Sequence, residues 1–323
     1  MQHPHRPNSS AARANVGLLG LLAAYHLLAA ALPASAAQTC GDLKQFASVD
    51  MTLDSFGRPL VPVAIDGKQQ QMMLDTGGVI STLTQRAFEE TGRTALRRDD
   101  IVLDDVRGNR MDRSVTLPYV TIGQVRSRSW RFWIHAPDMD LGSTTSGPVA
   151  GTLAPDVLAK FDVDLDFGRK TVKLFSPDHC EGRVLYWMPS ALAVIPFERE
   201  VSGHIMIPVS IDGQRLQALV DTGAASTMMN LTVAQRRFGL DEGTTNTGPS
   251  VHQFRSLELQ GLAVANPIIR LIPDRIAQVM PSELGGVMSA PRQGLADVII
   301  GQNIIGKFHL YIAYGESRLY LTD

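Results

Sequence analysis

The same segment occurs twice in the sequence, 146 residues apart, and this duplication constrains the fold more than any other feature. The first copy, VPVAIDGKQQQMMLDTG, runs from Val61 to Gly77, and the second, IPVSIDGQRLQALVDTG, runs from Ile207 to Gly223 without a gap. An internal repeat indicates that one structural unit is used more than once along a chain. We therefore expect two similar units, each built around its own copy.

Each copy of the repeat predicts a β-hairpin. An alternating apolar strand leads into an Asp-Gly pair, at 66–67 in the first copy and at 212–213 in the second. Asp-Gly between two such strands is a strong indicator of a tight hairpin turn. A second apolar strand then ends in Asp-Thr-Gly, so Asp75 and Asp221 are expected just beyond a strand end.

The far ends of the two copies also match. TLAPDVLAKFDVDLDFGRKTVKL (Thr152 to Leu174) parallels IIGQNIIGKFHLYIAYGESRLYL (Ile299 to Leu321), each with a short helical stretch, a strand, a turn with Gly and a closing strand. Between these ends, the first copy predicts strands at Ile101–Val106, Ser114–Ile122 and Trp130–His135. Helix is scarce, so we predict an all-β fold with two similar β-barrel lobes related by a pseudo-two-fold axis.

The amino terminus predicts export. Basic Arg6 and Arg13 precede an apolar run from Val16 to Leu32, and small residues ending at Ala36 provide a cleavage site. We expect a signal peptide at residues 1–36 and a mature protein that is periplasmic or secreted. A retained membrane anchor is the alternative, but the apolar run is shorter than the roughly 20 residues that a spanning helix prefers.

A linker rich in Pro, Asp, Gly and Ser is expected between the two lobes. We place the N-terminal lobe at 37–178, the linker at 179–190 and the C-terminal lobe at 191–323. Cys40 and Cys180 are the only cysteines, so in an oxidising compartment each has one intramolecular partner. We expect a disulfide between them, with two unpaired thiols as the alternative.

Two Asp-Thr-Gly loops that meet at the pseudo-two-fold axis would bring their carboxyl groups close together. Both cannot then ionise, so one proton is shared, an effect for which aspartic proteases are the known example. One carboxylate acts as a base on water while its protonated partner donates to a substrate carbonyl. We therefore predict Asp75 and Asp221 as the catalytic pair, in an active-site cleft between the lobes.

The residues that follow each Asp are expected to support the pair. Thr76 and Thr222 offer hydroxyls that can form hydrogen bonds across the axis. Gly77 and Gly223 allow a tight turn and leave room for the opposite loop.

These residues resemble the retropepsin-like aspartic peptidases, including the exported bacterial members with two fused copies. The resemblance is carried by MLDTGGVIST, by LVDTGAAST and by Val298–Ile305, which is similar to the retroviral segment that packs beneath the Asp loop. It covers most of Val61–Leu174 and Ile207–Leu321. It implies cleavage of an extended polypeptide, held in the cleft by β-hairpin flaps.

The resemblance leaves some positions open. Flap candidates are the turn Arg107-Gly108-Asn109-Arg110 and the less distinct Gly248-Pro249, for which ordinary surface turns are the alternative. Ala154 stands where the second copy has Gly301, so the supporting loop of the first lobe is expected to pack differently.

The residues after the two Asp-Thr-Gly triplets predict the range of pH in which the enzyme works. Gly78 and Ala224 occupy positions where pepsin-like enzymes carry a hydroxyl that helps to hold the pair ionised. We therefore predict an activity optimum nearer to neutral than to strongly acid pH.

Other classes of function lack support. A net charge of −2 and a pI of about 6.4 provide no basic surface for nucleic acid. The histidines of the mature chain show no metal-ligand spacing, so neither a metal nor another cofactor is expected. The segment from Gly301 to Lys307 has the spacing of a phosphate-binding loop, but Phe308 follows where Ser or Thr is required.

The sequence thus predicts an exported aspartic endopeptidase that acts on polypeptide as a monomeric pseudo-dimer. Two alternatives remain open: a non-catalytic peptide-binding scaffold of the same fold, and a homodimer in which like copies pair between chains.

Overall fold

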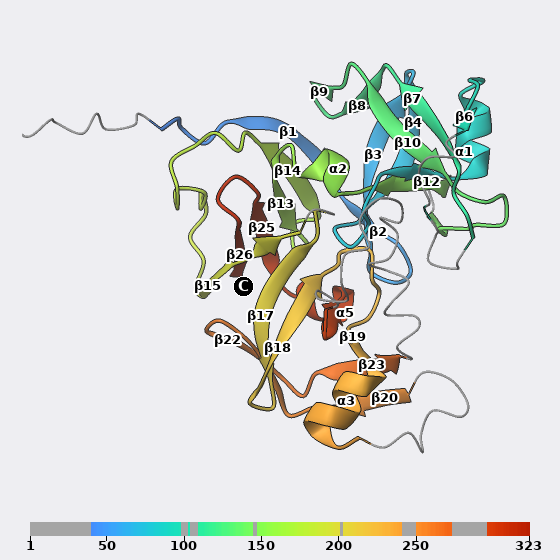
Figure 1. Cartoon of the computed structure of the whole chain (residues 1–323). Coiled ribbons are helices and arrows are strands. Elements are labelled where there is room, and N and C mark those ends of the chain that lie inside the picture. Colours follow the sequence, from blue (N-terminus) through green and yellow to red (C-terminus); the bar gives the residue numbers. More distant parts are fainter. Residues whose placement is uncertain are drawn as a thin grey trace, which may run out of the picture. The chain divides into compact units, whose positions relative to one another are not determined.

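The computed structural model of the chain (Figure 1) describes residues 40–97, 103, 109–144, 147–200, 203–240, 250–272 and 296–323. Residues from Cys40 to Asp323 form one compact unit. The predicted signal peptide at 1–36 lies outside the described residues. Among those that are described, no helix has the length and apolar character needed to cross a membrane.

The described residues are predominantly β-structure, in three sheets. We call the part from β1 to β14 the first half and the part from β15 to β26 the second half. The first half contributes an eleven-stranded sheet in the order β6-β7-β10-β5-β12-β4-β3-β8-β9, with β11 beside β12 and β2 beside β3. Its strands are β2 (Thr52–Leu53), β3 (Pro59–Ile65), β4 (Lys68–Leu74), β5 (Thr82–Leu83), β6 (Leu96–Arg97), β7 (Arg113–Leu117), β8 (Val120–Ile122), β9 (Val125–Arg126), β10 (Trp130–Ile134), β11 (Ser143–Thr144) and β12 (Gly147–Leu153).

The second half contributes a nine-stranded sheet in the order β20-β23-β19-β24-β18-β17-β21-β22, with β16 beside β17. Its strands are β16 (Glu198–Arg199), β17 (Ile205–Ile211), β18 (Gln214–Val220), β19 (Met228–Asn230), β20 (Ser250–Gln253), β21 (Ser256–Leu259), β22 (Leu262–Ala265), β23 (Ile268–Ile272) and β24 (Val298–Ile300). Short helices accompany the sheets: α1 (Gln85–Glu90), α2 (Pro155–Leu158), α3 (Leu231–Phe238) and α5 (Gln302–Ile305).

A third, six-stranded sheet is shared by both halves, in the order β1-β14-β13-β25-β26-β15. Its strands are β1 (Gln45–Asp50), β13 (Asp162–Asp166), β14 (Thr171–Phe175), β15 (Leu192–Pro196), β25 (His309–Ala313) and β26 (Arg318–Thr322). Figure 1 shows β25 and β26, in red, beside the green β13 and β14. At its centre Val163 pairs with Ile312 and Leu165 pairs with Leu310.

The register of this central strand pair supports a pseudo-two-fold relation between the halves. Residues 163 and 165 are the repeat equivalents of 310 and 312, so each pairing is the other one with the halves exchanged. An antiparallel pair across a two-fold axis requires this reciprocity. The predicted all-β fold of two similar lobes is therefore confirmed, within a single chain.

The repeated segments form the predicted hairpins, β3–β4 and β17–β18. In the first turn φ is +48° at Asp66 and +85° at Gly67, and in the second it is +45° at Asp212 and +79° at Gly213. Two successive positive φ angles are typical of a type I′ turn, whose twist matches that of the flanking strands.

The strand predicted at Ser114–Ile122 is two strands in the structure. β7 ends at Leu117, Pro118 interrupts the pairing, and β8 begins at Val120. Proline has no backbone N–H to donate to a neighbouring strand, so the chain turns there from one strand partner to another. Of the strand predicted at Ile101–Val106, only Leu103 belongs to the described residues.

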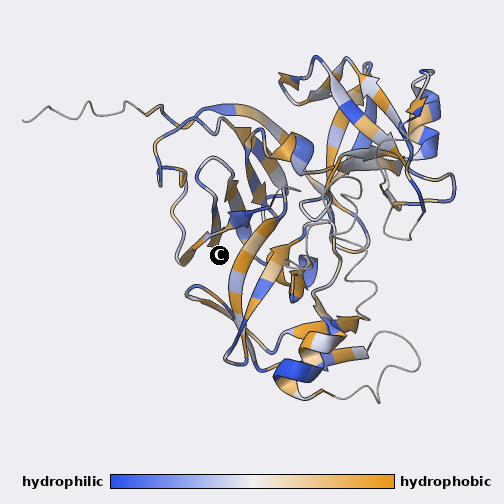
Figure 2. Ribbon diagram, viewed as in Figure 1, coloured by the Kyte–Doolittle hydropathy of each residue, from blue (hydrophilic) through white to orange (hydrophobic). Residues whose placement is uncertain are grey.

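One apolar core runs through both halves. Leu74 and Phe132 of the first half and Val220 and Ile300 of the second belong to the same cluster of buried residues. Trp130 also lies in this core, as expected for an apolar position of an alternating strand. Figure 2 shows that β17 is largely apolar, whereas α3 carries many polar residues.

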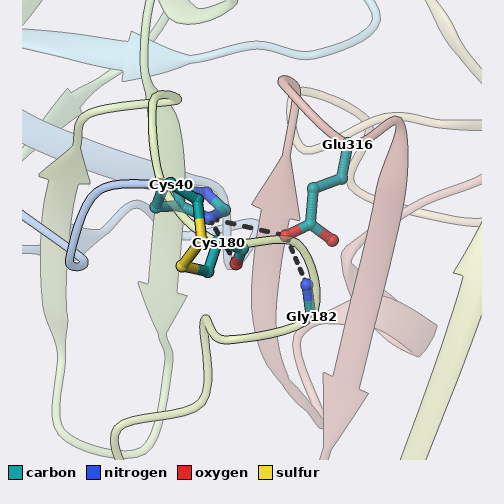
Figure 3. Close-up of a disulfide and its surroundings, with 5 residues drawn as sticks. Cys40, Cys180, Gly182 and Glu316 are labelled. Atoms are coloured by element: carbon teal, nitrogen blue, oxygen red, sulfur yellow. Dashed lines mark hydrogen bonds and ion pairs between the residues drawn. A yellow bond between two sulfur atoms is a disulfide. The ribbon is translucent and has the colours of Figure 1, made fainter. Parts of the chain in front are cut away.

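Cys40 and Cys180 form a disulfide, as the sequence predicts (Figure 3). Cys40 precedes β1 and Cys180 lies in the segment between β14 and β15. In the same segment, the N–H of Gly182 donates to Oε1 of Glu316 at 2.8 Å. The connection between the halves is thus fixed both to the start of the compact unit and to the second half.

Candidate active site

The two Asp-Thr-Gly loops begin where β4 and β18 end. A parallel strand lies beside each of these: β12 pairs with β4, and β24 pairs with β18. The pairing continues into the loops, because the N–H of Asp75 donates to Leu153 O at 2.9 Å and that of Asp221 to Ile300 O at 3.0 Å. Each aspartate is therefore held by the sheet of its own half.

Four hydrogen bonds clasp the two loops together. The Thr76 hydroxyl donates to Val220 O at 2.7 Å and accepts from the N–H of Thr222 at 3.0 Å. The Thr222 hydroxyl reciprocates, donating to Leu74 O at 2.7 Å and accepting from the N–H of Thr76 at 3.1 Å. Both threonines are fully buried, so these bonds have no competition from water.

The clasp brings each carboxyl group against the glycine of the opposite loop. A Cβ atom at Gly77 would lie 2.2 Å from Cγ of Asp221, and one at Gly223 would lie 2.5 Å from Oδ1 of Asp75. No side chain fits at such distances. The two glycines are thus required by the close approach of the loops.

Backbone N–H groups hold one oxygen of each carboxyl. Oδ1 of Asp75 accepts from Gly77 at 3.1 Å and from Gly78 at 2.9 Å. Oδ1 of Asp221 accepts from Gly223 at 2.8 Å and from Ala224 at 3.0 Å. These contacts fix the orientation of both carboxyl groups. Each aspartate therefore has equivalent backbone partners in its own loop.

The pKa values of the pair depart from ordinary aspartates, and not equally. Burial raises the pKa of Asp75, although the N–H of Gly78 and the hydrogen bond with Asp221 oppose it. Burial and the charge of Asp75 together raise the pKa of Asp221 well above its usual range. Asp221 is also the more buried residue, at 2% exposed, while Asp75 is partly exposed. Burial and the proximity of the two carboxyls thus favour one proton shared by the pair.

The sequence predicts a supporting segment beneath the Asp loop at Val298–Ile305, but not the residues that fasten each loop to its support. Asp156 accepts from both the N–H and the hydroxyl of Ser81, at 2.9 and 2.7 Å. Asn303 accepts in the same way from the N–H and hydroxyl of Thr227, at 2.7 and 2.8 Å. The two sets occupy equivalent positions of the repeat, but their residue types differ, which hid them from a comparison of identical residues.

The structure explains why the first half has Ala154 where the second half has Gly301. In the first half a Cβ atom at Gly78 would lie 3.3 Å from Cβ of Ala154, so one small residue makes room for the other. In the second half the sizes are exchanged: Ala224 has the methyl group, and a Cβ at Gly301 would lie 2.7 Å from Ala224 O. Each half therefore keeps a single methyl group between the loop and its supporting strand.

The flap prediction stays a prediction. Asn109 and Arg110 belong to the described residues, whereas Arg107, Gly108 and the pair Gly248-Pro249 lie outside them. Within the part of the chain that is described, no group of three or more His, Cys, Asp or Glu residues is arranged to hold a metal ion.

Two repeated β lobes with a shared sheet, and two carboxyl groups presented by clasped Asp-Thr-Gly loops, define an aspartic-type peptidase. Comparison with family models gives one match in each half: "gag-polyprotein putative aspartyl protease" at residues 61–143 and "Aspartyl protease" at residues 207–304. The chain is thus an aspartic-type peptidase with one aspartyl protease domain in each half.

Among solved structures, the chain is similar to a retropepsin-like aspartic protease from Rickettsia conorii. The identity is 18%, the match covers 42% of this chain and 94% of that one, and the TM-score is 0.29. The strand pairings described above, and not this similarity, define the fold. The comparison with curated proteins gave no match.

Proposed function

We propose that this protein is an exported aspartic endopeptidase in which Asp75 and Asp221 together activate a water molecule. The observation that carries the proposal is the reciprocal clasp of Thr76 and Thr222, which holds both carboxyl groups against the opposite loop. A clasp formed inside one chain also supports a monomeric pseudo-dimer. The family implies a polypeptide as the substrate.

The proposed reaction needs one proton on the pair at the start. The ionised carboxylate takes a proton from water, the hydroxide adds to the peptide carbonyl carbon, and the other carboxyl gives its proton to the carbonyl oxygen. The resulting diol collapses as the C–N bond breaks. The nitrogen receives the proton taken from water, and a diol hydroxyl returns a proton to the second carboxylate, which restores the pair.

Export is supported by two independent features. The amino-terminal 36 residues have the pattern of a signal peptide, and Cys40, just beyond it, forms a disulfide with Cys180. Disulfides persist in the periplasm and outside the cell, whereas cytosolic thiols are kept reduced. We place the mature enzyme in one of these oxidising compartments.

Asp75→Asn and Asp221→Asn test the proposal. Each variant is assayed with a mixture of unstructured polypeptides while its mass in solution is measured. We expect either substitution alone to lower turnover by at least about a thousandfold, since the loss of either member of the pair removes general acid-base catalysis. Asp66→Asn is the matched control, because Asp66 lies in a hairpin turn away from the pair and Asn tolerates its positive φ.

The outcomes separate the proposal from its alternatives. Cleavage by a monomer that either substitution abolishes supports it. Binding of extended peptides without cleavage at any pH would instead identify a non-catalytic scaffold. Activity that requires a dimer would show that the pair assembles between chains.

A further inference from the structure

Each half carries a small hairpin immediately before its repeated segment, and the two hairpins are equivalent in the repeat. In the first half, β2 pairs with the start of β3, and Asp54 to Arg58 form the tip. In the second half, β16 pairs with the start of β17, and Glu200, Gly203 and His204 belong to the corresponding tip. Asp54 and Glu200 are 146 residues apart, as are Arg58 and His204. One half thus carries a permanent cation where the other carries an imidazole.

Both tips reach the supporting helix of the opposite half. A Cβ atom at Gly57 would lie 3.8 Å from Cβ of Gln302 in α5, and one at Gly203 would lie 2.5 Å from Cβ of Pro155 in α2. These helices follow directly after the strands that flank the Asp-Thr-Gly loops. Each tip is therefore delivered to the helix that follows the supporting strand of the other half.

His204 illustrates this delivery. Its Nε2 lies 2.9 Å from Gly77 O, and because a carbonyl oxygen only accepts, Nε2 carries a proton and donates it. His204 is 3% exposed, and burial lowers its pKa, so the ring is neutral near pH 7. Gly77 is the glycine that lies against the carboxyl of Asp221. A neutral hydrogen-bond donor is thus bound to the glycine that lies beside Asp221.

Arg58 is the residue of the first half that corresponds to His204 in the repeat, and its hydrogen-bond partners lie within its own half. Its Nε lies 2.6 Å from Oδ2 of Asp54, and its terminal nitrogen donates to Leu141 O at 2.9 Å. These contacts hold the guanidinium in one position, from which its charge lowers the pKa of Asp75 in opposition to the larger effect of burial. The backbone contacts of the two carboxyls match, whereas the residues at the two tips differ: a guanidinium in one half and an imidazole in the other.

We propose that Arg58 and His204 are positioning residues that make the two carboxyls unequal, with Asp75 as the base that takes a proton from water and Asp221 as the acid that protonates the substrate carbonyl. This assignment of roles rests on the proposed function. On the side of Asp75, the charged groups involved are Arg58 and its partner Asp54. On the side of Asp221, the titratable groups are His204 and Glu200, and Oε2 of Glu200 lies 3.9 Å from Nδ1 of His204.

Arg58→Gln tests the role of the cation. Removal of a positive charge disfavours an ionised carboxyl, so the pKa of Asp75 rises, and the acid limb of kcat/KM against pH moves to higher pH by roughly half a unit or more. Arg58→Lys retains the charge and should restore the acid limb. His204→Lys introduces the missing cation beside Asp221, so it should move the alkaline limb to lower pH.

Arg93→Gln is the matched control. Arg93 also pairs with an aspartate of its own half, Asp66, at 2.7 Å, but it lies on an exposed turn away from the pair. Its pH profile should coincide with that of the wild type. Thermal unfolding of every variant identifies those that fail to fold, and an Arg58→Gln protein that folds with both limbs unchanged would overturn the proposal.

A second measurement does not depend on turnover. Carbon-13 NMR of the aspartate carboxyls, assigned with Asp75→Asn and Asp221→Asn, follows each group through its titration. We expect Asp75 to ionise at lower pH than Asp221, and the gap to narrow in Arg58→Gln. Ionisation of Asp221 first would overturn the assignment even in an active enzyme. A wild type that shows the expected order but cleaves nothing would instead refute the proposed function alone.

Discussion

The threonine hydroxyls contribute more to this site than their size suggests, because each one is both a donor and an acceptor across the boundary between the halves. Valine has nearly the same shape but no hydroxyl. Thr76→Val would leave Val220 O without its donor and the Thr222 N–H without its acceptor. Both groups are buried, so water cannot replace the lost partner.

We therefore expect Thr76→Val to destabilise the fold by about 1–3 kcal/mol and to lower kcat, because the loops lose their mutual register. Thr76→Ser retains the hydroxyl and should stay close to the wild type in both respects. Unfolding in denaturant and turnover at saturating substrate measure the two effects. Thr116→Val, at an exposed position of β7, controls for the substitution itself, and a Thr76→Val protein as stable as this control would contradict the role of the clasp.

His204 has a second consequence, for stability. Its folded pKa is lowered by burial, so between that value and about 6.5 the unfolded chain binds its proton more tightly. Stability from this residue is therefore complete above pH 6.5 and is lost as the pH falls. His204→Gln lacks the titrating ring and should lose less stability than the wild type between about pH 7 and pH 5, as measured by denaturant unfolding. Equal losses in the two proteins would contradict a lowered pKa.

For single residues, the sequence identified candidate positions in the two loops because both copies carry the same residue there. Asp, Thr and Gly of the two loops were identified in this way. Ser81 and Thr227 perform one structural task with different side chains, and so do Asp156 and Asn303. Their shared task follows from hydrogen bonds between segments far apart in sequence, and the pattern along the chain does not show these bonds.

Among the elements, the repeated hairpins were the most predictable, because strand alternation and an Asp-Gly turn both specify the same local structure. The strand expected at Ser114–Ile122 was predicted as one piece because its apolar residues outweighed Pro118. In the structure the strand is interrupted at this proline, because it has no N–H to donate to a neighbouring strand. A change of strand partner is a tertiary event, so the length of an apolar run does not report it.

The disulfide fastens the segment before β1 to the segment after β14. These strands pair along one edge of the six-stranded sheet. The bond spans 140 residues, and closure of a long loop restricts the unfolded chain strongly.

We expect Cys40→Ser with Cys180→Ser to lower the free energy of unfolding by about 2–5 kcal/mol while turnover in the folded protein changes little. Denaturant unfolding and a peptide assay under folding conditions measure the two effects. The same reductant applied to wild type and variant is the control: it should destabilise the wild type alone. A wild type insensitive to reductant would show that the bond does not stabilise the fold.

For the whole molecule, the sequence predicted two lobes and a pseudo-two-fold axis, but not how the halves are joined. The joint is the shared sheet, in which β13 and β25 meet at the axis and β1 and β15 form the edges. Neither edge strand belongs to the repeated segments that the sequence comparison identified. Their placement depends on how the two halves pack against each other, and the strands that meet there lie about 150 residues apart in the chain.

A buried ionic cluster connects the three parts of this joint. His179, in the linker, places Nε2 2.6 Å from Oδ2 of Asp162 in β13 and Nδ1 3.5 Å from Oε1 of Glu316, which precedes β26. Nδ1 also lies 3.1 Å from Cys180 O. Both ring nitrogens thus face oxygen acceptors, and only the doubly protonated imidazolium can donate to both sides.

This geometry predicts how the stability of the joined halves depends on pH. Burial alone lowers the pKa of His179, but the hydrogen bonds to Asp162 and Cys180 and the charges of Asp162 and Glu316 raise it above its usual range. The stabilisation is therefore complete below about pH 6.5 and is lost as the pH rises through the folded pKa. Burial also raises the pKa of Asp162, the carboxyl that faces His179.

We expect His179→Gln to be less stable than the wild type near pH 6, and the difference to shrink steadily towards pH 9, because the wild type loses the charge that the variant never had. Denaturant unfolding at a series of pH values measures this difference. His252→Gln is the matched control, since His252 lies in β20 of the nine-stranded sheet and contacts Phe254 instead of a carboxylate. The difference in stability between His252→Gln and the wild type should not shrink from pH 6 towards pH 9. A His179→Gln difference that stays constant from pH 6 to pH 9 would mean that the ring packs in the joint without carrying charge, and that the halves are held together by the sheet and its apolar core alone.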